Sequence, residues 1–230
     1  MSAITINKMQ EPCYFCKSNK FKQVKLDDKT GVFYKCKNCS LITLSKENVP
    51  QDQKEHYSSV YYDENYSGRK NIAEAFYYRL PIIEKFAARG EKVLEVGAAS
   101  GDFLDVLKNR GYDVYGIELS SRAVVKAKEN YDIDIKEGTL DSSRFKENEF
   151  RAILMYHVLE HIEDPISLLK EAYKKIEHGG VLIIEVPNPI SIDALSKKLL
   201  GSILDYPHHI YAFPPKVLRT MLEEAGFEII

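Results

Sequence analysis

The chain has 230 residues, a formal net charge of −2, 44% hydrophobic residues and 29% charged residues. This composition is typical of a globular protein with a hydrophobic core, and the lack of a basic excess argues against a DNA-binding protein that depends on phosphate contacts. No apolar run approaches the roughly 20 residues of a membrane-spanning helix, and the start "MSAITINKMQ" lacks the pattern of a secretory signal. We therefore expect a cytoplasmic protein.

All cysteines fall into two Cys-x-x-Cys pairs near the start of the chain, Cys13/Cys16 and Cys36/Cys39. The pairs flank two short β-like runs, residues 20–26 and 32–35, which the hairpin signal "DDKTG" separates. This spacing predicts a ribbon over residues 1–45 that binds one Zn²⁺ through four thiolates. The alternative is a set of inert or redox-active thiols. Because four thiolates fill a tetrahedral ion, the zinc would be structural.

The next segment, residues 46–70, is polar and rich in tyrosine. We interpret it as a linker that folds back as a lid, although scattered aromatic residues also serve in packing.

From residue 71 onward, helical and strand patterns alternate as in an α/β domain over residues 71–230. A helical pattern covers residues 71–90, with a kink expected at Pro81. Strands are predicted at 92–96, 114–119, 133–136, 150–155 and 181–186, and helices at 102–110, 121–130, 166–176 (ended by "HGG") and 215–225. The fold class is therefore α/β, a Rossmann-like, mostly parallel sheet with helices on both faces, preceded by the small zinc-ribbon-like unit. A further strand starts at 227–230, so we expect the domain to be truncated at the C-terminus.

In an open parallel sheet, ligands bind beyond the carboxyl ends of the strands. The first predicted strand ends in "LEVGAASGDFL", where Gly97 and Gly101 bracket a loop of small residues that leads into a helix. The second ends at Glu118, 21 residues after Gly97. An acidic side chain at this spacing can accept hydrogen bonds from both hydroxyls of a ribose.

The ordered motifs "VLEVGAASGDFL", "YGIELS", "FRAILMYHVLEHIEDP", "GGVLIIEVPN" and "HHIYAFPPKVLRTMLEEAGFEII" resemble those of class I S-adenosylmethionine-dependent methyltransferases. The family's glycine loop is matched at Glu95, Gly97 and Gly101, while Ala99 replaces its middle glycine. The resemblance implies that S-adenosylmethionine is bound by residues at the ends of four strands: Glu95, Gly97, Ala98, Ala99, Gly101, Glu118, Leu119, Thr139, Leu140 and Tyr156.

The cysteine pairs restrict the resemblance to one subgroup of these methyltransferases. A four-cysteine zinc unit before such a domain resembles the sugar C-methyltransferases that act on nucleotide-linked deoxysugars, and their relatives from polysaccharide clusters. In those enzymes a histidine base lies in a segment after the fifth strand, and "DYPHHIYAF" is the matching segment here. The resemblance implies that His209 is the catalytic base.

The phrase "MYHVLEHIEDP" holds the remaining candidates. Tyr156 and His157 directly follow the fourth strand, where a methyl acceptor would sit, so we predict that they are catalytic. Glu160 and His161 are interpreted as the structural turn before Pro165. The alternative is a catalytic transition metal held by His157, Glu160 and His161, with His209 as a later ligand.

The sequence thus predicts an S-adenosylmethionine-dependent methyltransferase that acts on a small molecule, a sugar or nucleotide sugar, without membrane or nucleic-acid partners. One alternative is an O-methyltransferase of a quinol or natural-product hydroxyl. Another is a non-catalytic module whose zinc ribbon binds protein or RNA.

Overall fold

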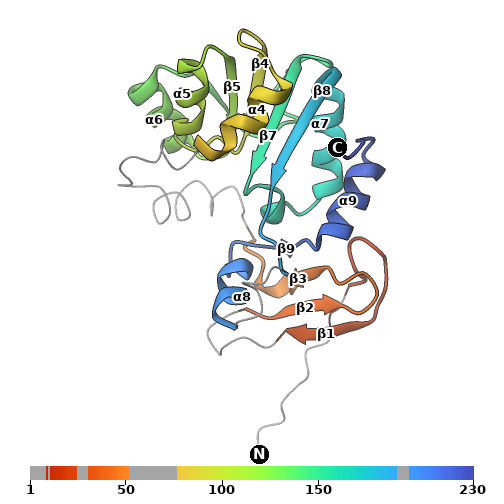
Figure 1. The fold of residues 1–230 in the computed structure, drawn as a ribbon. Helices are drawn as coiled ribbons and strands as arrows, with labels where there is room; N and C mark the ends of the chain where they lie inside the picture. Colours follow the sequence, from red (N-terminus) through yellow and green to blue (C-terminus); the bar gives the residue numbers. More distant parts are fainter. Residues whose placement is uncertain (1–8, 10, 25–30, 52–76, 191–196) are drawn as a thin grey trace, which may run out of the picture. The chain divides into compact units, whose positions relative to one another are not determined.

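The computed structural model describes residues 9, 11–24, 31–51, 77–190 and 197–230. The chain divides into two compact units (Figure 1). The cysteine unit is built from residues 1–49, 187–224 and 228–230, and the parallel-sheet unit from residues 50–186 and 225–227. Within the described ranges, no helix has the length and apolar character needed to cross a membrane.

The parallel-sheet unit contains five parallel strands in the order β6-β5-β4-β7-β8. They are β4 (Lys92–Val96), β5 (Asp113–Glu118), β6 (Ile135–Glu137), β7 (Phe150–Tyr156) and β8 (Ile176–Glu185). The central strand β4 pairs with β5 on one side and with β7 on the other. The predicted α/β class and parallel sheet are confirmed.

Helices cover both faces of this sheet. Apolar residues therefore continue along the central strands without alternating with polar ones. On one face, Val93 and Leu154 pack with α4 (Leu80–Phe86), α5 (Asp102–Asn109) and α6 (Ser121–Tyr131). On the other face, Leu94 and Ile153 pack with α7 (Pro165–Lys175), which Figure 1 shows on the side of the sheet away from α4. Ser120 caps α6 by accepting a hydrogen bond from the Ala123 amide, as its position predicts.

Three local predictions are wrong. Pro81 does not kink a helix but lies in the first turn of α4, where a proline needs no hydrogen-bond donor.

"HGG" does not follow α7, because the helix ends at Lys175 and these residues lie within β8. A Cβ on Gly180 would lie 2.8 Å from the Arg151 carbonyl oxygen, so the glycine permits close approach of β8 to β7. Residues 227–230 form no strand; instead the Phe227 ring packs 5.2 Å from that of Tyr173.

The cysteine unit is an antiparallel sheet in the order β1-β2-β3-β9. Its strands are β1 (Phe21–Val24), β2 (Phe33–Cys36), β3 (Ile42–Leu44) and β9 (Tyr211–Ala212). The helices of this unit within the described residues are η1 (Lys46–Asn48), α8 (Lys197–Leu204) and α9 (Pro215–Glu224). The sequence assigns residues 187–224 to the methyltransferase domain, whereas in the structure they group with the cysteine residues.

Some predicted features lie outside the described residues. These are most of the lid segment, the start of the helical pattern at residues 71–76, and most of the "DDKTG" turn. The antiparallel pairing of β1 with β2 agrees with the hairpin that the turn predicts.

Candidate functional site

The loop between β4 and α5 folds back on the tip of β5. The amides of Gly97 and Ala98 both donate to the Ile117 carbonyl oxygen, at 2.9 and 3.0 Å. Gly97 and Gly101 have positive φ angles of 73° and 76°. A Cβ on Gly97 would lie only 2.7 Å from Cγ2 of Val158. Glycine is therefore required at residue 97 by both backbone conformation and space.

Ala99 also adopts the left-handed region, with φ 45°, in the place of the family's middle glycine. Its amide donates to Oε2 of Glu118 at 2.9 Å, while the Ser120 amide donates to Oε1 at 2.9 Å. Burial raises the pKa of Glu118, although these amides act in the opposite direction. The Glu118 carboxylate is thus held at the junction of two strand ends, with further lone pairs available for a ligand's hydroxyls.

The next predicted cofactor residues follow β6. The Gly138 amide donates to the Glu118 carbonyl oxygen at 2.9 Å, which brings this turn beside the tip of β5. Thr139 is exposed and its amide donates to Oγ of Ser142 at 3.0 Å. Leu140 is buried in the core with β4 and β7. The turn after β6 and the tip of β5 therefore lie side by side, so Glu118 and Thr139 are at the same edge of the sheet as the glycine loop.

Glu95 lies in β4, two residues before Gly97, and its side chain is buried. Burial raises the pKa of Glu95 to about 8, against the charge of Arg79 and with the aid of Asp102 and Glu118. Its Oε2 atom and the hydroxyl of Tyr156 are buried and meet no hydrogen-bond partner within the described residues. Buried polar atoms of this kind are expected to meet a ligand or water.

Arg79 is a residue of this site that the sequence did not single out. Its guanidinium lies 3.8 Å from the centroid of the Tyr156 ring, and its Nη2 donates to Oε1 of Glu185 at 2.9 Å. Tyr78 donates to the same carboxylate at 3.0 Å. Arg79 comes from η3 (Tyr77–Arg79), just before α4. In the sequence Arg79 lies inside the predicted helical pattern of residues 71–90, where no motif marks it as a site residue.

His157 lies beyond the tip of β7 with a left-handed backbone, φ 56°. Its Nδ1 contacts Oε1 of Glu160 at 3.2 Å and its Nε2 contacts Oε1 of Glu185 at 3.0 Å. The hydrogen bond to Glu160 raises the pKa of His157, and the charge of Glu185 acts in the same direction. A ring that faces a carboxylate at each nitrogen is stabilised as the imidazolium cation.

His209 belongs to the cysteine unit, whereas the residues described above belong to the parallel-sheet unit. It is buried, and its Nδ1 donates to the Ile203 carbonyl oxygen at 2.6 Å. Because a carbonyl can only accept, this contact places a proton on Nδ1. In the neutral ring Nε2 then carries the lone pair, and it lies 3.9 Å from Oδ2 of Asp205.

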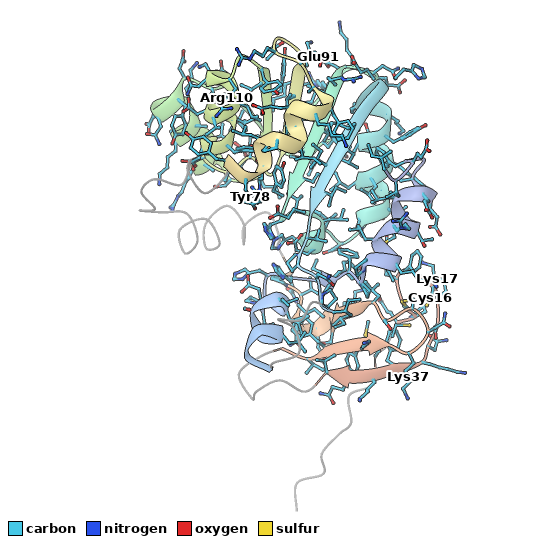
Figure 2. The ribbon with its side chains drawn as sticks, viewed as in Figure 1. Cys16, Lys17, Lys37, Tyr78, Glu91 and Arg110 are labelled. Carbon is cyan, nitrogen blue, oxygen red and sulfur yellow. The ribbon has the colours of Figure 1, made fainter. Side chains whose placement is uncertain are left out.

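The four cysteines converge. Sγ of Cys13 lies 3.6 Å from that of Cys39, Sγ of Cys16 lies 3.5 Å from that of Cys36, and all four lie within 4.8 Å of one another. Zinc–sulfur bonds of about 2.3 Å in a tetrahedron place sulfurs roughly 3.8 Å apart. The set therefore fits one tetrahedral ion, and the sulfur atoms cluster beside the labelled Cys16 in Figure 2.

The two Cys-x-x-Cys loops also share a backbone conformation. The residues that follow them, Lys17 and Ser40, have φ angles of 57° and 69°. Their amides donate to the carbonyl oxygens of the first cysteine of each pair, at 2.9 and 3.0 Å. Two equivalent turns that aim four sulfurs at one point are the geometry of paired zinc knuckles.

Comparison with known proteins gives the following relationships. A family model described as "Methyltransferase domain" matches residues 69–230. A curated "Probable S-adenosylmethionine-dependent methyltransferase" of Mycolicibacterium smegmatis is 26% identical over 168 residues, which is 73% of this chain and 61% of that protein. A "Ubiquinone biosynthesis O-methyltransferase" of Psychrobacter arcticus is 26% identical over 60% of this chain and 59% of its own length. The chain thus spans less than two thirds of these two relatives.

A further ubiquinone biosynthesis O-methyltransferase, from Coxiella burnetii, is 29% identical over 82% of this chain and 87% of its own length. Among solved structures, a SAM-dependent methyltransferase from Thermotoga maritima has a TM-score of 0.55 at 26% identity and covers 69% of this chain and 74% of its own. One from Archaeoglobus fulgidus has a TM-score of 0.58 at 22% identity, covers 73% of each chain, and shares the fold.

Proposed function

The chain belongs to the methyltransferase-domain family, and from this premise we propose that it transfers a methyl group from S-adenosylmethionine to a sugar or nucleotide-linked sugar. The observation that carries the cofactor assignment is the Glu118 carboxylate, which the amides of Ala99 and Ser120 fix beside the glycine loop. This arrangement suits a ribose and a ligand that lies against the loop.

The residues present fit the cofactor. When bound, S-adenosylmethionine supplies a methyl group on a sulfonium centre. Glu118 would accept hydrogen bonds from its ribose hydroxyls, and Leu119, Thr139 and Leu140 would border its base. Glu95, Arg79 and Tyr156 would hold its charged amino-acid end. That placement would give a polar ligand to Oε2 of Glu95 and to the hydroxyl of Tyr156, which meet no hydrogen-bond partner among the described residues.

On the acceptor side, we assign different roles to the two histidines. His209 removes the acceptor proton through Nε2, because Ile203 holds the proton of the neutral ring on Nδ1. His157 faces a carboxylate at each ring nitrogen, so its role is to hold Glu160 and Glu185 beside the acceptor and not to act as the base. Tyr156 forms the adjoining wall of the acceptor site.

The cysteine unit holds one structural Zn²⁺ through Cys13, Cys16, Cys36 and Cys39. The convergence of all four sulfurs supports this assignment, and it requires the reduced thiols of a cytoplasmic setting. With four thiolate ligands the ion would have no open position, so it would take no part in the chemistry.

A second candidate function is O-methylation of a quinol. It is favoured by the relatives named as ubiquinone biosynthesis O-methyltransferases. A non-catalytic module is not supported, because the family match covers residues 69–230 and the Glu118 site is intact.

The test uses the full chain, isotopically labelled S-adenosylmethionine and two acceptor panels, nucleotide-linked deoxysugars and quinols. We expect label transfer to a member of the sugar panel. His209→Ala should lower that rate by at least about 100-fold. The control is His178→Ala, which changes an exposed histidine in β8 of the other unit. Transfer to quinols alone would establish the second candidate, and an unimpaired His209→Ala enzyme would refute this base.

A further inference from the structure

The segment that carries His209 is built into the sheet that carries the cysteines. Residues 211 and 212 form β9, which pairs antiparallel with β3 in the register Thr43↔Tyr211 and Ile42↔Ala212. The Leu44 amide extends this pairing by donating to the Ile210 carbonyl oxygen at 2.8 Å. The strand that follows His209 is thus held by backbone hydrogen bonds to β3.

Each Cys-x-x-Cys loop, called a knuckle below, contacts β9 or its partner strand β3. At the end of the second knuckle, which contains Cys36 and Cys39, the Cys36 amide donates to the Leu41 carbonyl oxygen at 2.9 Å, and β3 begins at the next residue. The first knuckle contributes Tyr14, whose ring lies 5.4 Å from that of Tyr211. The second knuckle is therefore connected to β9 through the backbone of β3, and the first knuckle contacts β9 through the ring of Tyr14.

The orientation of the imidazole depends on the same unit. His209 donates to the Ile203 carbonyl oxygen in α8, and the neighbouring Leu204 packs in a cluster with Phe33, Ile42 and Leu44. This cluster is small for an independent core. A small hydrophobic cluster of this kind can gain its order from a bound metal ion or another cross-link.

We propose that the ion bound by the four cysteines positions the catalytic base, with Tyr14 and Tyr211 as positioning residues. Metal binding orders the knuckles, the knuckles fix β3 and Tyr14, and these fix β9 and hence residues 205–213. The structural coupling stands on the contacts above, while its consequence for catalysis rests on the proposed role of His209.

The first test is hydrogen–deuterium exchange on the full chain, with zinc bound and after removal by a chelator. Protection of residues 41–45 and 208–213 should fall together on metal removal, while β4 and β7 keep theirs. Affinity for S-adenosylmethionine should change by less than about twofold. Zinc addition should restore protection and methyl transfer. Unchanged protection of residues 208–213 after zinc loss would overturn the proposal.

The second test uses two adjacent aromatic residues of one knuckle. Tyr14→Ala should retain one zinc per chain, lower kcat by about tenfold and leave KM for S-adenosylmethionine unchanged. Phe15→Ala, the matched control, should alter neither constant. Equal effects of the two variants would refute the positioning role of Tyr14. If His209→Ala remains active while exchange still follows zinc, the base assignment fails but the structural coupling stands.

Discussion

At the scale of single residues, Glu95 makes an unusual contribution to stability. Its pKa in the folded chain is about 8 and is raised above the ordinary 4.5 by burial. Between these values the folded chain binds one more proton than the unfolded chain, so stability falls as pH rises. The slope contributed by one such group is about 1.4 kcal/mol per pH unit.

We therefore expect the ligand-free protein to lose thermal stability from pH 5 to pH 8, and Glu95→Gln to flatten this dependence. Thermal unfolding at fixed ionic strength measures both. Glu129→Gln, an exposed carboxyl of α6, is the control and should follow the parent chain. A Glu95→Gln profile parallel to that of the parent would contradict the assigned pKa.

His157 provides a second test at this scale. The hydrogen bond to Glu160, with the charge of Glu185, raises its pKa, so its contribution to stability is complete below the unfolded value of 6.5 and is lost as pH rises through the folded pKa. Glu185→Gln should lower the pKa of His157, followed by NMR of the imidazole protons. Glu171→Gln, a carboxyl that pairs with Lys174 and Lys175 in α7, should leave it unchanged. An unaltered titration in Glu185→Gln would exclude the contact.

At the scale of elements, the loop between β4 and α5 can be tested by steric rescue. Gly97→Ala adds a Cβ 2.7 Å from Cγ2 of Val158 at a positive φ angle. We expect it to cost about 1–3 kcal/mol of unfolding free energy and to weaken cofactor binding. Gly90→Ala, also at positive φ but with nothing within 4 Å, isolates the backbone cost.

Chemical denaturation of Gly97→Ala, Val158→Ala and the double variant measures the steric part. Val158→Ala should recover much of the loss caused by Gly97→Ala, because the clashing methyl group is removed. Strict additivity of the two substitutions would show that the contact with Val158 is not the cause.

The elements of the parallel sheet were predictable because their signals are local. Apolar runs bounded by turn residues located β4 and β7, and Ser120 located the start of α6. The return of β9 to β3 was not predictable, since it depends on pairing between residues some 170 positions apart. The prediction that "HGG" ends a helix was wrong, because Gly180 lies in β8, where the lack of a side chain permits close contact with β7. Arg79 was missed because its partners Tyr156 and Glu185 are joined to it only by the fold.

At the scale of the whole molecule, the proposed functional residues are distributed over two units. The parallel-sheet unit carries the proposed cofactor residues, and the cysteine unit carries the proposed base and metal ligands. We expect elemental analysis to find one zinc per chain. Thiol reagents should react with the four cysteines only after a chelator is added. Cys39→Ser should abolish retention of zinc, whereas Ser40→Ala, next to it, should not. Four reactive thiols in the untreated protein would contradict the metal site.

Calorimetric titration of the full chain with S-adenosylmethionine tests the central claim most directly. The account predicts binding of one cofactor per chain, weakened at least about tenfold by Glu118→Ala, because that change removes the ribose-binding carboxylate. Asp113→Ala removes an exposed carboxylate at the opposite end of β5 and should bind like the parent chain. Absence of binding by the parent chain, or equal affinity in Glu118→Ala, would contradict the proposed cofactor site.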